Sequence, residues 1–434
     1  MIPRLAWFGA VAVLLGACMT PVVPPTTAPD ATTTSRPQAI EETTSTASGE
    51  VEVKPSTTEP VPTTSPLLTG KVVSPSGTAL AGSTVSAGDA KVTTGEDGGF
   101  QISMGVLLDT PITITRPGWM SVTYQWDAAS PLNIALEPRT VRGLRVSPAA
   151  AGNQELFSVL LDMAERSSIN TFVFDTKEEG GRVVYASNVV EANEIGAVDP
   201  AYDPVAAIAE SEYAGIYTVS RVVVFEDEIR AQARPDLRLA GVFLDPGNRD
   251  AWEYPIDLAA EACQLGFDEI QFDYVRYPSS IEGGGLSEEE RVNNITAFLA
   301  QAAVRLHQLG CAVSADVFGI VLSTDNDQGI GQRPEEISAV VDAFSPMIYP
   351  SHYSDGWLGF DKPNDHPGPV VADALDDGLP RVAPTSVMRP WLQAFYYGGE
   401  QVRAQIAEAE ERGTGWILWN VRSEYGQDWV PGEE

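Results

Sequence analysis

The fold of this chain is decided at Asp268-Glu-Ile-Gln-Phe-Asp-Tyr-Val-Arg-Tyr-Pro278. Apolar Ile270 and Phe272 alternate with polar Gln271 and Asp273, which is the pattern of a β-strand. A carboxylate, a guanidinium and two phenol rings crowd the end of this strand. In a chain of repeated β/α units, active sites are built at the carboxyl ends of the strands. The stretch therefore predicts a buried strand that delivers functional side chains, and it points toward an enzyme.

Seven further segments predict strands, and helical stretches lie between most of them. The eight predicted strands are Arg142–Ser147, Asn170–Asp175, Ile216–Phe225, Glu269–Tyr274, Ala312–Phe318, Ala343–Tyr349, Arg381–Ser386 and Gly415–Asn420. Eight β/α units within residues 140–434 favour a C-terminal (β/α)8 TIM-type barrel of the α/β class over an open sheet. No GxGxxG fingerprint follows the first strand, which disfavours a dinucleotide-binding fold.

The predicted helices carry signals at their ends. Asp203-Pro204 supplies an N-cap and a first-turn proline, and Gly215 ends the same helix. Ser287 and Glu290 form a capping box. The helix that follows has one apolar stripe with spacings of three and four: Val292, Ile295, Leu299, Ala302, Leu306 and Leu309.

Residues 67–139 show short β-type runs separated by turn residues, which predicts a small all-β sandwich. The runs are Gly70–Val73, Ser83–Ser86, Phe100–Ser103, Ile112–Thr115 and Leu132–Leu136. The order of Gly70-Lys-Val-Val73, Ala81-Gly-Ser-Thr-Val85, Thr93–Phe100 and Pro117-Gly-Trp119 resembles the carboxypeptidase regulatory-like β-sandwich. This segment contains no obvious reactive cluster, so we interpret it as a spacer or a weak binding module.

The N-terminus predicts a targeting signal. Arg4 precedes an apolar run from Leu5 to Gly16 that is too short for a permanent membrane-spanning helix. The run ends in Leu15-Gly-Ala-Cys18, which looks like a bacterial lipobox, a signal in which cleavage precedes the Cys and its thiol carries the lipid. We predict a lipoprotein signal peptide over residues 1–18 and a protein exported and tethered at a membrane surface, outside the cytoplasm. An ordinary secretory signal with an incidental Cys is the alternative.

Residues 19–66 consist almost entirely of Thr, Pro, Ser, Val, Ala and Glu. Such a segment cannot bury enough apolar surface to offset the entropy of ordering, so we predict a disordered linker.

The charge balance narrows the classes of partner. The chain carries 60 acidic and 27 basic side chains, a formal net charge of -33. This charge disfavours nucleic acid, whose phosphates would be repelled, and docking on anionic lipid through a basic patch. The acidic residues are mostly scattered pairs such as Glu178-Glu179, which we interpret as solvated surface. Cys263 and Cys311 could pair or remain free thiols, and no cluster predicts a metal or another cofactor.

Functional side chains follow most of the predicted barrel strands. Asp273 and Asp316, from neighbouring strands, match the needs of glycosidic cleavage, in which one carboxyl donates a proton and the other stabilises or attacks the oxocarbenium-like centre. We predict Asp273 as the nucleophile or charge-stabilising carboxylate and Asp316 as the acid/base, although the sequence allows the roles to be exchanged. The side chains predicted to position a sugar are Asp175, Lys177, Arg276, Tyr349, His352, Arg389, Trp391, Trp419 and Asn420.

Each of these residues also has a structural interpretation. Asp273 could merely pair with Arg276, and Asp316 could bond to a neighbouring strand or to loop amides. Lys177 could form a surface ion pair with Glu178 or Glu179. His352 lacks a nearby second His or Cys at ligand spacing, so a loop or substrate contact is favoured over a metal ligand.

The barrel segment also carries an ordered series of motifs: Phe174-Asp-Thr-Lys-Glu-Glu-Gly180, Gly266–Pro278, Gly329-Ile-Gly-Gln332, Ser345-Pro-Met-Ile-Tyr-Pro-Ser-His-Tyr353, Arg389-Pro-Trp-Leu-Gln393 and Gly415-Trp-Ile-Leu-Trp-Asn420. Over residues 141–425 the series resembles the bacterial putative glycoside hydrolase domain, first described as a domain of unknown function. The resemblance implies a TIM barrel and a carbohydrate-active enzyme without giving a substrate, and it adds Gln393 to the predicted binding residues. The family typically continues its Arg-Pro-Trp-Leu-Gln motif with an acid, where this chain has Ala394.

These observations lead us to expect a glycoside hydrolase that cleaves an extracellular or cell-envelope polysaccharide. A non-catalytic carbohydrate-binding or envelope-scaffolding lipoprotein is the rival from another class. A barrel enzyme for another reaction, such as polysaccharide deacetylation or a lyase reaction, is a third possibility. The lack of metal-ligand spacing disfavours the usual deacetylase.

Overall fold

The computed structural model describes residues 67–103, 110–126, 131–279, 285–430 and 432. The predicted signal peptide, Cys18 and the predicted linker over residues 19–66 lie outside this range.

Two antiparallel-rich sheets form within the described part of residues 67–135. A three-stranded sheet has the order β4 (Gly99–Ser103), β1 (Leu67–Val73) and β7 (Leu132–Ala135). A four-stranded sheet has the order β3 (Ala90–Thr93), β2 (Thr84–Ala87), β5 (Pro111–Thr115) and β6 (Val122–Gln125). Side chains from both sheets share one core, which includes Val72, Val85, Ile112, Ile114 and Ile134. The five predicted strands are confirmed, whereas β3 and β6 were not predicted because their residues are mostly exposed or half-buried and show no continuous apolar face.

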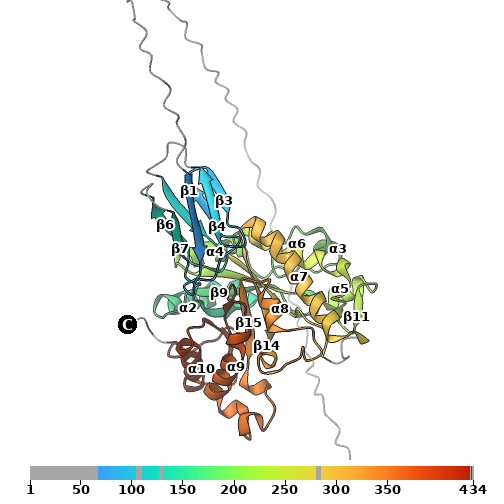
Figure 1. The fold of residues 1–434 in the computed structure, drawn as a ribbon. Helices are drawn as coiled ribbons and strands as arrows, with labels where there is room; N and C mark the ends of the chain where they lie inside the picture. The colour runs from blue at the N-terminus through green and yellow to red at the C-terminus, as the bar shows by residue number, and fades with distance from the viewer. Residues whose placement is uncertain (1–66, 104–109, 127–130, 280–284, 431, 433–434) are drawn as a thin grey trace, which may run out of the picture. The chain divides into compact units, whose positions relative to one another are not determined.

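The nine-stranded sheet is a closed parallel barrel (Figure 1). Its strands, in chain order, are β8 (Arg142–Val146), β9 (Thr171–Lys177), β10 (Tyr217–Val223), β13 (Glu269–Asp273), β14 (Ala312–Phe318), β15 (Ala343–Ile348), β16 (Val387–Met388), β17 (Trp391–Gln393) and β18 (Trp416–Trp419). Strand β18 pairs with β8 and β14 pairs with β15, so the ring has no free edge. Strands β16 and β17 both pair with β15 and together fill one of eight strand positions. The predicted TIM-type barrel is confirmed.

The predicted seventh strand, Arg381–Ser386, is wrong. Arg381 ends the 3-10 helix η8 (Leu379–Arg381), and its guanidinium binds Glu335 and the carbonyls of Val321 and Leu322. The strand forms later, in two short pieces on either side of Pro390. Proline has no N–H to donate to a ladder, which accounts for the interruption.

Helices alternate with the barrel strands. They are α1 (Pro148–Ala151), α2 (Gln154–Glu165), α3 (Val190–Glu194), α4 (Pro204–Tyr213), α5 (Glu228–Ala233), α6 (Glu253–Leu265), α7 (Glu288–Leu309), α8 (Pro334–Ser338), α9 (Pro367–Gly378) and α10 (Gly399–Glu411). Figure 1 shows α6 beside α7 and α9 beside α10, pairs that are also in contact. No helix within the described residues is both long and apolar enough to cross a membrane.

The predicted helix signals are largely confirmed. The Asp203 side chain accepts from the N–H groups of Val205 and Ala206, and α4 ends before Gly215, whose φ is 72°. The capping box of Ser287 and Glu290 is present at the start of α7. The apolar stripe of α7 is buried except for Leu309, which is 41% exposed because the helix ends there.

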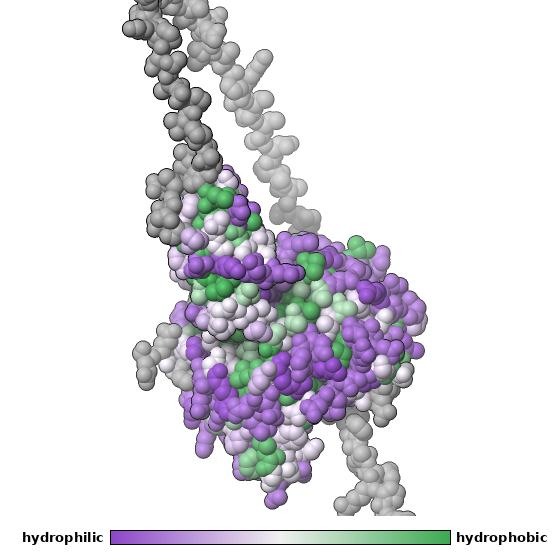
Figure 2. All heavy atoms as spheres, in the orientation of Figure 1, coloured by the Kyte–Doolittle hydropathy of each residue, from purple (hydrophilic) through white to green (hydrophobic). Residues whose placement is uncertain are grey.

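Short segments complete the barrel. They are the hairpin β11 (Arg238–Ala240) with β12 (Phe243–Leu244), and the 3-10 helices η1 (Glu179–Gly181), η2 (Arg249–Ala251), η4 (Gly319–Ser323), η5 (Pro350–His352), η6 (Trp357–Gly359) and η7 (Pro363–Asp365). Cys263 and Cys311 form a disulfide with a Cα–Cα distance of 6.0 Å, which resolves the two alternatives left by the sequence. The face seen in Figure 2 is largely hydrophilic, in keeping with the acidic composition.

Candidate active site

A cavity of about 380 Å³ lies among the carboxyl ends of the barrel strands. Side chains from six strands line it: Arg221 of β10, Asp273 of β13, Asp316 and Phe318 of β14, Met347 of β15, Trp391 of β17 and Trp419 of β18. Pockets for small ligands span roughly 300–1,000 Å³, so this cavity is at the small end of that range. The position at the strand ends is the one predicted from the sequence.

Asp273 is held by Arg221, a residue that the sequence analysis did not single out. Arg221 donates to Asp273 Oδ2 from Nε at 2.9 Å and from Nη2 at 2.5 Å. The backbone N–H of Tyr274 donates to the other carboxylate oxygen at 2.6 Å. Only 3% of Asp273 is exposed. The alternative that Asp273 merely pairs with Arg276 is wrong, because its buried partner is Arg221.

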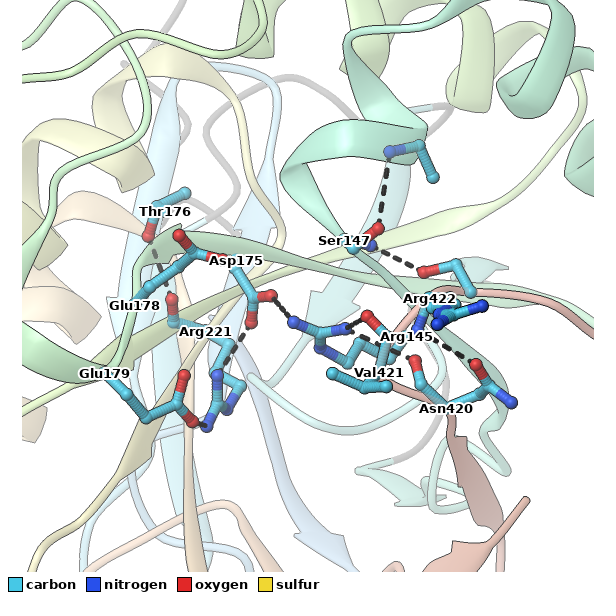
Figure 3. Close-up of polar contacts among 12 residues, drawn as sticks. Arg145, Ser147, Asp175, Thr176, Glu178, Glu179, Arg221, Asn420, Val421 and Arg422 are labelled. Atoms are coloured by element: carbon cyan, nitrogen blue, oxygen red, sulfur yellow. Dashed lines mark hydrogen bonds and ion pairs between the residues drawn. The ribbon is translucent and has the colours of Figure 1, made fainter. Parts of the chain in front are cut away.

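Arg221 also binds the carboxylates of Asp175 and Glu179 (Figure 3). Its Nη1 donates to Asp175 Oδ1 at 2.8 Å and its Nη2 donates to Glu179 Oε1 at 2.5 Å. Burial alone would lower the pKa of Arg221, but the charges of Asp273, Glu179 and Asp175 outweigh it and raise that pKa well above its usual value. Arg221 therefore remains a fixed positive charge at the base of the cavity.

Asp316 differs from Asp273 in its surroundings. Its Oδ1 accepts a hydrogen bond from Trp391 Nε1 at 2.7 Å. Its Oδ2 is buried without a hydrogen-bond partner and lies 4.0 Å from Arg221 Nε. Burial, together with the charge of Asp273, raises the pKa of Asp316 well above its usual range, and Arg221 and Trp391 only partly oppose this shift. Asp316 therefore favours its protonated form.

The two carboxyl groups are close neighbours. Asp273 Oδ2 lies 2.9 Å from Arg221 Nε and Asp316 Oδ2 lies 4.0 Å from the same atom, so the two oxygens are no farther apart than the sum of these distances. One carboxyl group bonded to a guanidinium therefore lies beside a second whose pKa is raised by burial. Two neighbouring carboxyl groups are the equipment that glycosidic cleavage needs.

Aromatic rings line much of the remaining wall. The rings of Trp391 and Trp419 meet edge to face at 5.3 Å, and those of Tyr349 and His352 meet edge to face at 5.2 Å. The guanidinium of Arg221 lies over the Trp419 ring at 4.7 Å. Burial lowers the pKa of His352, which favours the neutral imidazole. These rings offer stacking surfaces beside the two carboxyl groups.

Arg276 also lines the cavity, as predicted, and three rings surround its guanidinium. They are Phe243 at 5.0 Å, Tyr274 at 4.9 Å and Phe318 at 4.8 Å. Tyr274 has a φ of 52°, the left-handed conformation that non-glycine residues rarely adopt. Strained backbone of this kind persists where the surroundings fix it, and it often marks functional sites.

The family described as "Putative glycosyl hydrolase domain" matches residues 143–425, a span that contains this cavity and every barrel strand except the first residue of β8. The chain belongs to this family. A search of curated proteins found no match.

Solved structures resemble the chain at low identity. The glycoside hydrolase domain of PgaB (BpsB) from Bordetella bronchiseptica is 13% identical with a TM-score of 0.52, covering 68% of this chain and 100% of that one. The glycoside hydrolase domain of PelA from Pseudomonas aeruginosa is 13% identical with a TM-score of 0.40, covering 67% and 98%. A hypothetical protein from Ruminiclostridium thermocellum is 35% identical with a TM-score of 0.36, covering 40% and 97%. The PgaB likeness supports a glycoside-hydrolase-like fold.

Five predicted site residues do not line this cavity, and two of them, Asp175 and Lys177, are held in buried ion pairs on β9. Asp175 has no exposed surface, and Arg145 and Arg221 engage its two oxygens. Lys177 is buried, pairs with Asp227 at 2.9 Å and donates to the carbonyl of Val223 at 2.8 Å. The alternative of a surface pair with Glu178 or Glu179 is therefore also wrong.

The other three are held by partners outside the cavity lining. Arg389 is buried and bonds to Glu269 at 2.6 Å, near the opposite ends of the strands. Gln393 is buried, accepts from the N–H of Ser351 at 3.1 Å and donates to Asn364 at 3.2 Å. Asn420 caps a turn by accepting from the N–H of Arg422 at 2.9 Å (Figure 3). These contacts shape the loops instead of reaching the cavity. Ala394, where the family typically has an acid, is likewise buried outside the lining.

Glu179 lines the cavity, although we interpreted Glu178-Glu179 as solvated surface. Its position four residues after the predicted strand Asn170–Asp175 was the available signal. Within the described residues, no group of three or more His, Cys, Asp or Glu side chains is arranged to hold a metal ion.

Proposed function

We propose that this barrel is a glycoside hydrolase that cleaves an extracellular or cell-envelope polysaccharide with Asp316 as acid/base and Asp273 as nucleophile or charge-stabilising carboxylate. The observation that carries the proposal is the unequal pair of carboxyl groups around Arg221. Asp316 is buried with one unpartnered oxygen and a raised pKa, whereas Asp273 is bonded twice to Arg221. Membership of the glycosyl hydrolase family supports the same chemistry.

In the first step, Asp316 gives its proton to the glycosidic oxygen as the bond to the anomeric carbon breaks. The leaving sugar departs with a new hydroxyl group, and Asp273 stabilises or attacks the positively charged anomeric carbon. Water then adds to that carbon, displaces Asp273 where it had formed a bond, and gives a proton to Asp316. Arg221 keeps Asp273 oriented toward the same end of the barrel throughout the cycle.

The cavity wall fits a sugar ring in this mechanism. Trp391, Trp419 and Tyr349 would pack against the C–H faces of a pyranose, while Arg276 and neutral His352 would bond to its hydroxyl groups.

The test is release of reducing ends from a panel of cell-wall and extracellular polysaccharides by the mature protein. Asp273→Asn should abolish release, whereas Asp175→Asn should retain most of it, because Asp175 binds the same Arg221 but does not line the cavity. Equal release by the parent protein and by Asp273→Asn would remove Asp273 from the chemistry. Equal losses in both variants would mean that only the integrity of the arginine network matters.

A carbohydrate-binding protein without hydrolysis is the second candidate, and the burial of both carboxyl groups favours it. Only 3% of Asp273 and 1% of Asp316 are exposed, so neither reaches far into the cavity. A binder would retain glycan affinity in the Asp273→Asn variant and would release no reducing ends from any member of the panel.

We also propose an exported lipoprotein, with lipid on Cys18, residues 19–66 as a linker and residues 67–139 as a carboxypeptidase regulatory-like spacer. The lipobox-like end of the apolar N-terminal run supports this proposal. Cys18→Ala should move the protein from the membrane fraction to the soluble fraction, and unchanged membrane association would contradict it.

A further inference from the structure

The loop that follows β17 presents a tyrosine to solvent in a strained conformation. Tyr396 is 92% exposed and has a φ of 63°, in the left-handed region. A non-glycine residue in this region carries a cost in backbone strain. Because the ring is exposed, its packing offsets little of this strain. The stability of the fold therefore does not explain the conformation of Tyr396.

Neighbouring contacts anchor this loop. The carbonyl of Ala394 accepts from Asn420 Nδ2 at 2.8 Å, and the carbonyl of Phe395 accepts from Gln393 Nε2 at 3.2 Å. On the far side, the hydroxyl of Tyr397 donates to the carbonyl of Asn364 at 2.8 Å. Tyr396 is therefore held between fixed neighbours and its backbone is preorganised.

A series of rings connects this tyrosine to the cavity. Tyr349 and His352 line the cavity, and both contact Phe395, at 5.4 Å and 6.3 Å between ring centroids. Phe395 in turn meets the Tyr396 ring edge to face at 5.3 Å. The aromatic surface thus runs from the cavity wall to solvent in two ring-to-ring steps.

We propose that Phe395 and Tyr396 form an outer subsite that binds a further sugar ring of the same glycan chain, outside the cavity. The proposal rests on the proposed function, because it requires a glycan in the cavity. A cavity of about 380 Å³ has room for only a short part of a polymer, so the remaining chain must leave over the adjoining surface. A pyranose presents C–H groups on its faces, which suits stacking on an exposed aromatic ring.

The variant Tyr396→Ala tests the subsite, with Tyr213→Ala as the matched control. Tyr213 is a tyrosine of α4 that is 95% exposed, so its removal also deletes one solvated ring. Both variants are made in the mature chain with Asp273→Asn, so that bound glycan is not consumed. Native electrophoresis in gels that contain hydroxyethyl cellulose, glycol chitin, glycol chitosan, mannan or pullulan gives the dissociation constants.

We expect Tyr396→Ala to weaken binding of the preferred polysaccharide about tenfold, or 1.4 kcal/mol, through loss of one stacking surface. Tyr213→Ala and Tyr396→Phe should bind like the parent, and a disaccharide of the same glycan should bind all four proteins equally. Unchanged polysaccharide binding by Tyr396→Ala overturns the subsite, and so does failure of every glycan to retard the parent.

The outcomes separate the subsite from the hydrolase. Binding that depends on Tyr396, without any release of reducing ends by the chain that retains Asp273, supports the subsite and overturns only hydrolysis. Where Asp273 is retained, release of reducing ends at the same kcat/KM by the chain with Tyr396 and by the chain with Tyr396→Ala overturns only the subsite.

Discussion

Replacing Arg221 by Met removes the positive charge shared by Asp175, Glu179 and Asp273. Two of these partners are almost fully buried, while the Glu179 side chain is 38% exposed and is therefore partly screened by solvent. Breaking a buried pair by removing one member costs about 3–5 kcal/mol, because the remaining charge is left uncompensated. We expect Arg221→Met to lower the free energy of unfolding by this amount.

Urea denaturation followed by tryptophan fluorescence measures the change. The control is Arg142→Met, whose partner Glu410 is bound at 2.6 Å but where both side chains are about one-third exposed. Exposed pairs contribute roughly 0–1 kcal/mol, so Arg142→Met should lie in that range. A loss below about 1 kcal/mol for Arg221→Met would refute the view that the network is a buried, mutually dependent unit.

Three further perturbations test separate parts of the structure. Burial raises the pKa of Asp316 in the folded protein above its value in the unfolded chain. The stability that the protonated form contributes is therefore lost as pH rises above the pKa of the unfolded chain. Asp316→Asn should gain stability relative to the parent above about pH 4, by at most ~1.4 kcal/mol per pH unit. Parallel stability curves in pH-dependent urea titrations would contradict the raised pKa. Tyr274→Gly should be about 1 kcal/mol more stable than Tyr274→Ala, because only glycine adopts the φ of 52° without strain. A higher melting temperature for Tyr274→Ala than for Tyr274→Gly would count against this strain. Cys263→Ala with Cys311→Ala should lower the free energy of unfolding by about 4 kcal/mol for a 48-residue loop, and a reductant should destabilise the parent but not this variant.

The sequence predicted the barrel because its signals are local. Strand β13 alternates visibly and ends in functional residues, and Asp203, Ser287 and Glu290 mark helix ends through contacts within a few residues. The seventh strand was misplaced because each of its two pieces, β16 and β17, is too short for a periodic pattern to be recognised.

The site was predictable only in part. A position near the carboxyl end of a strand places a residue at the mouth, and this was sufficient to bring Asp273 and Asp316 to the cavity. Arg221 was missed because it lies inside an apolar strand and its partners Asp175 and Asp273 are 46 and 52 residues away. For the same reason the sequence did not indicate that Asp175 and Lys177 form buried ion pairs with other strands and loops of the barrel. Which charges neutralise one another depends on barrel register, which short-range patterns do not contain.

The proposed mechanism divides the roles between Asp316, which donates the proton, and Asp273, which stabilises or attacks the anomeric carbon. Two substrates of the sugar identified in the polysaccharide panel separate these roles: the polymer, and a dinitrophenyl glycoside whose leaving group needs no proton. Asp316→Asn should slow polymer hydrolysis by about 10²–10⁴-fold and leave dinitrophenyl release much less affected, whereas Asp273→Asn should slow both. The opposite pattern, with Asp273→Asn rescued by the activated leaving group and Asp316→Asn not rescued, would contradict the assignment.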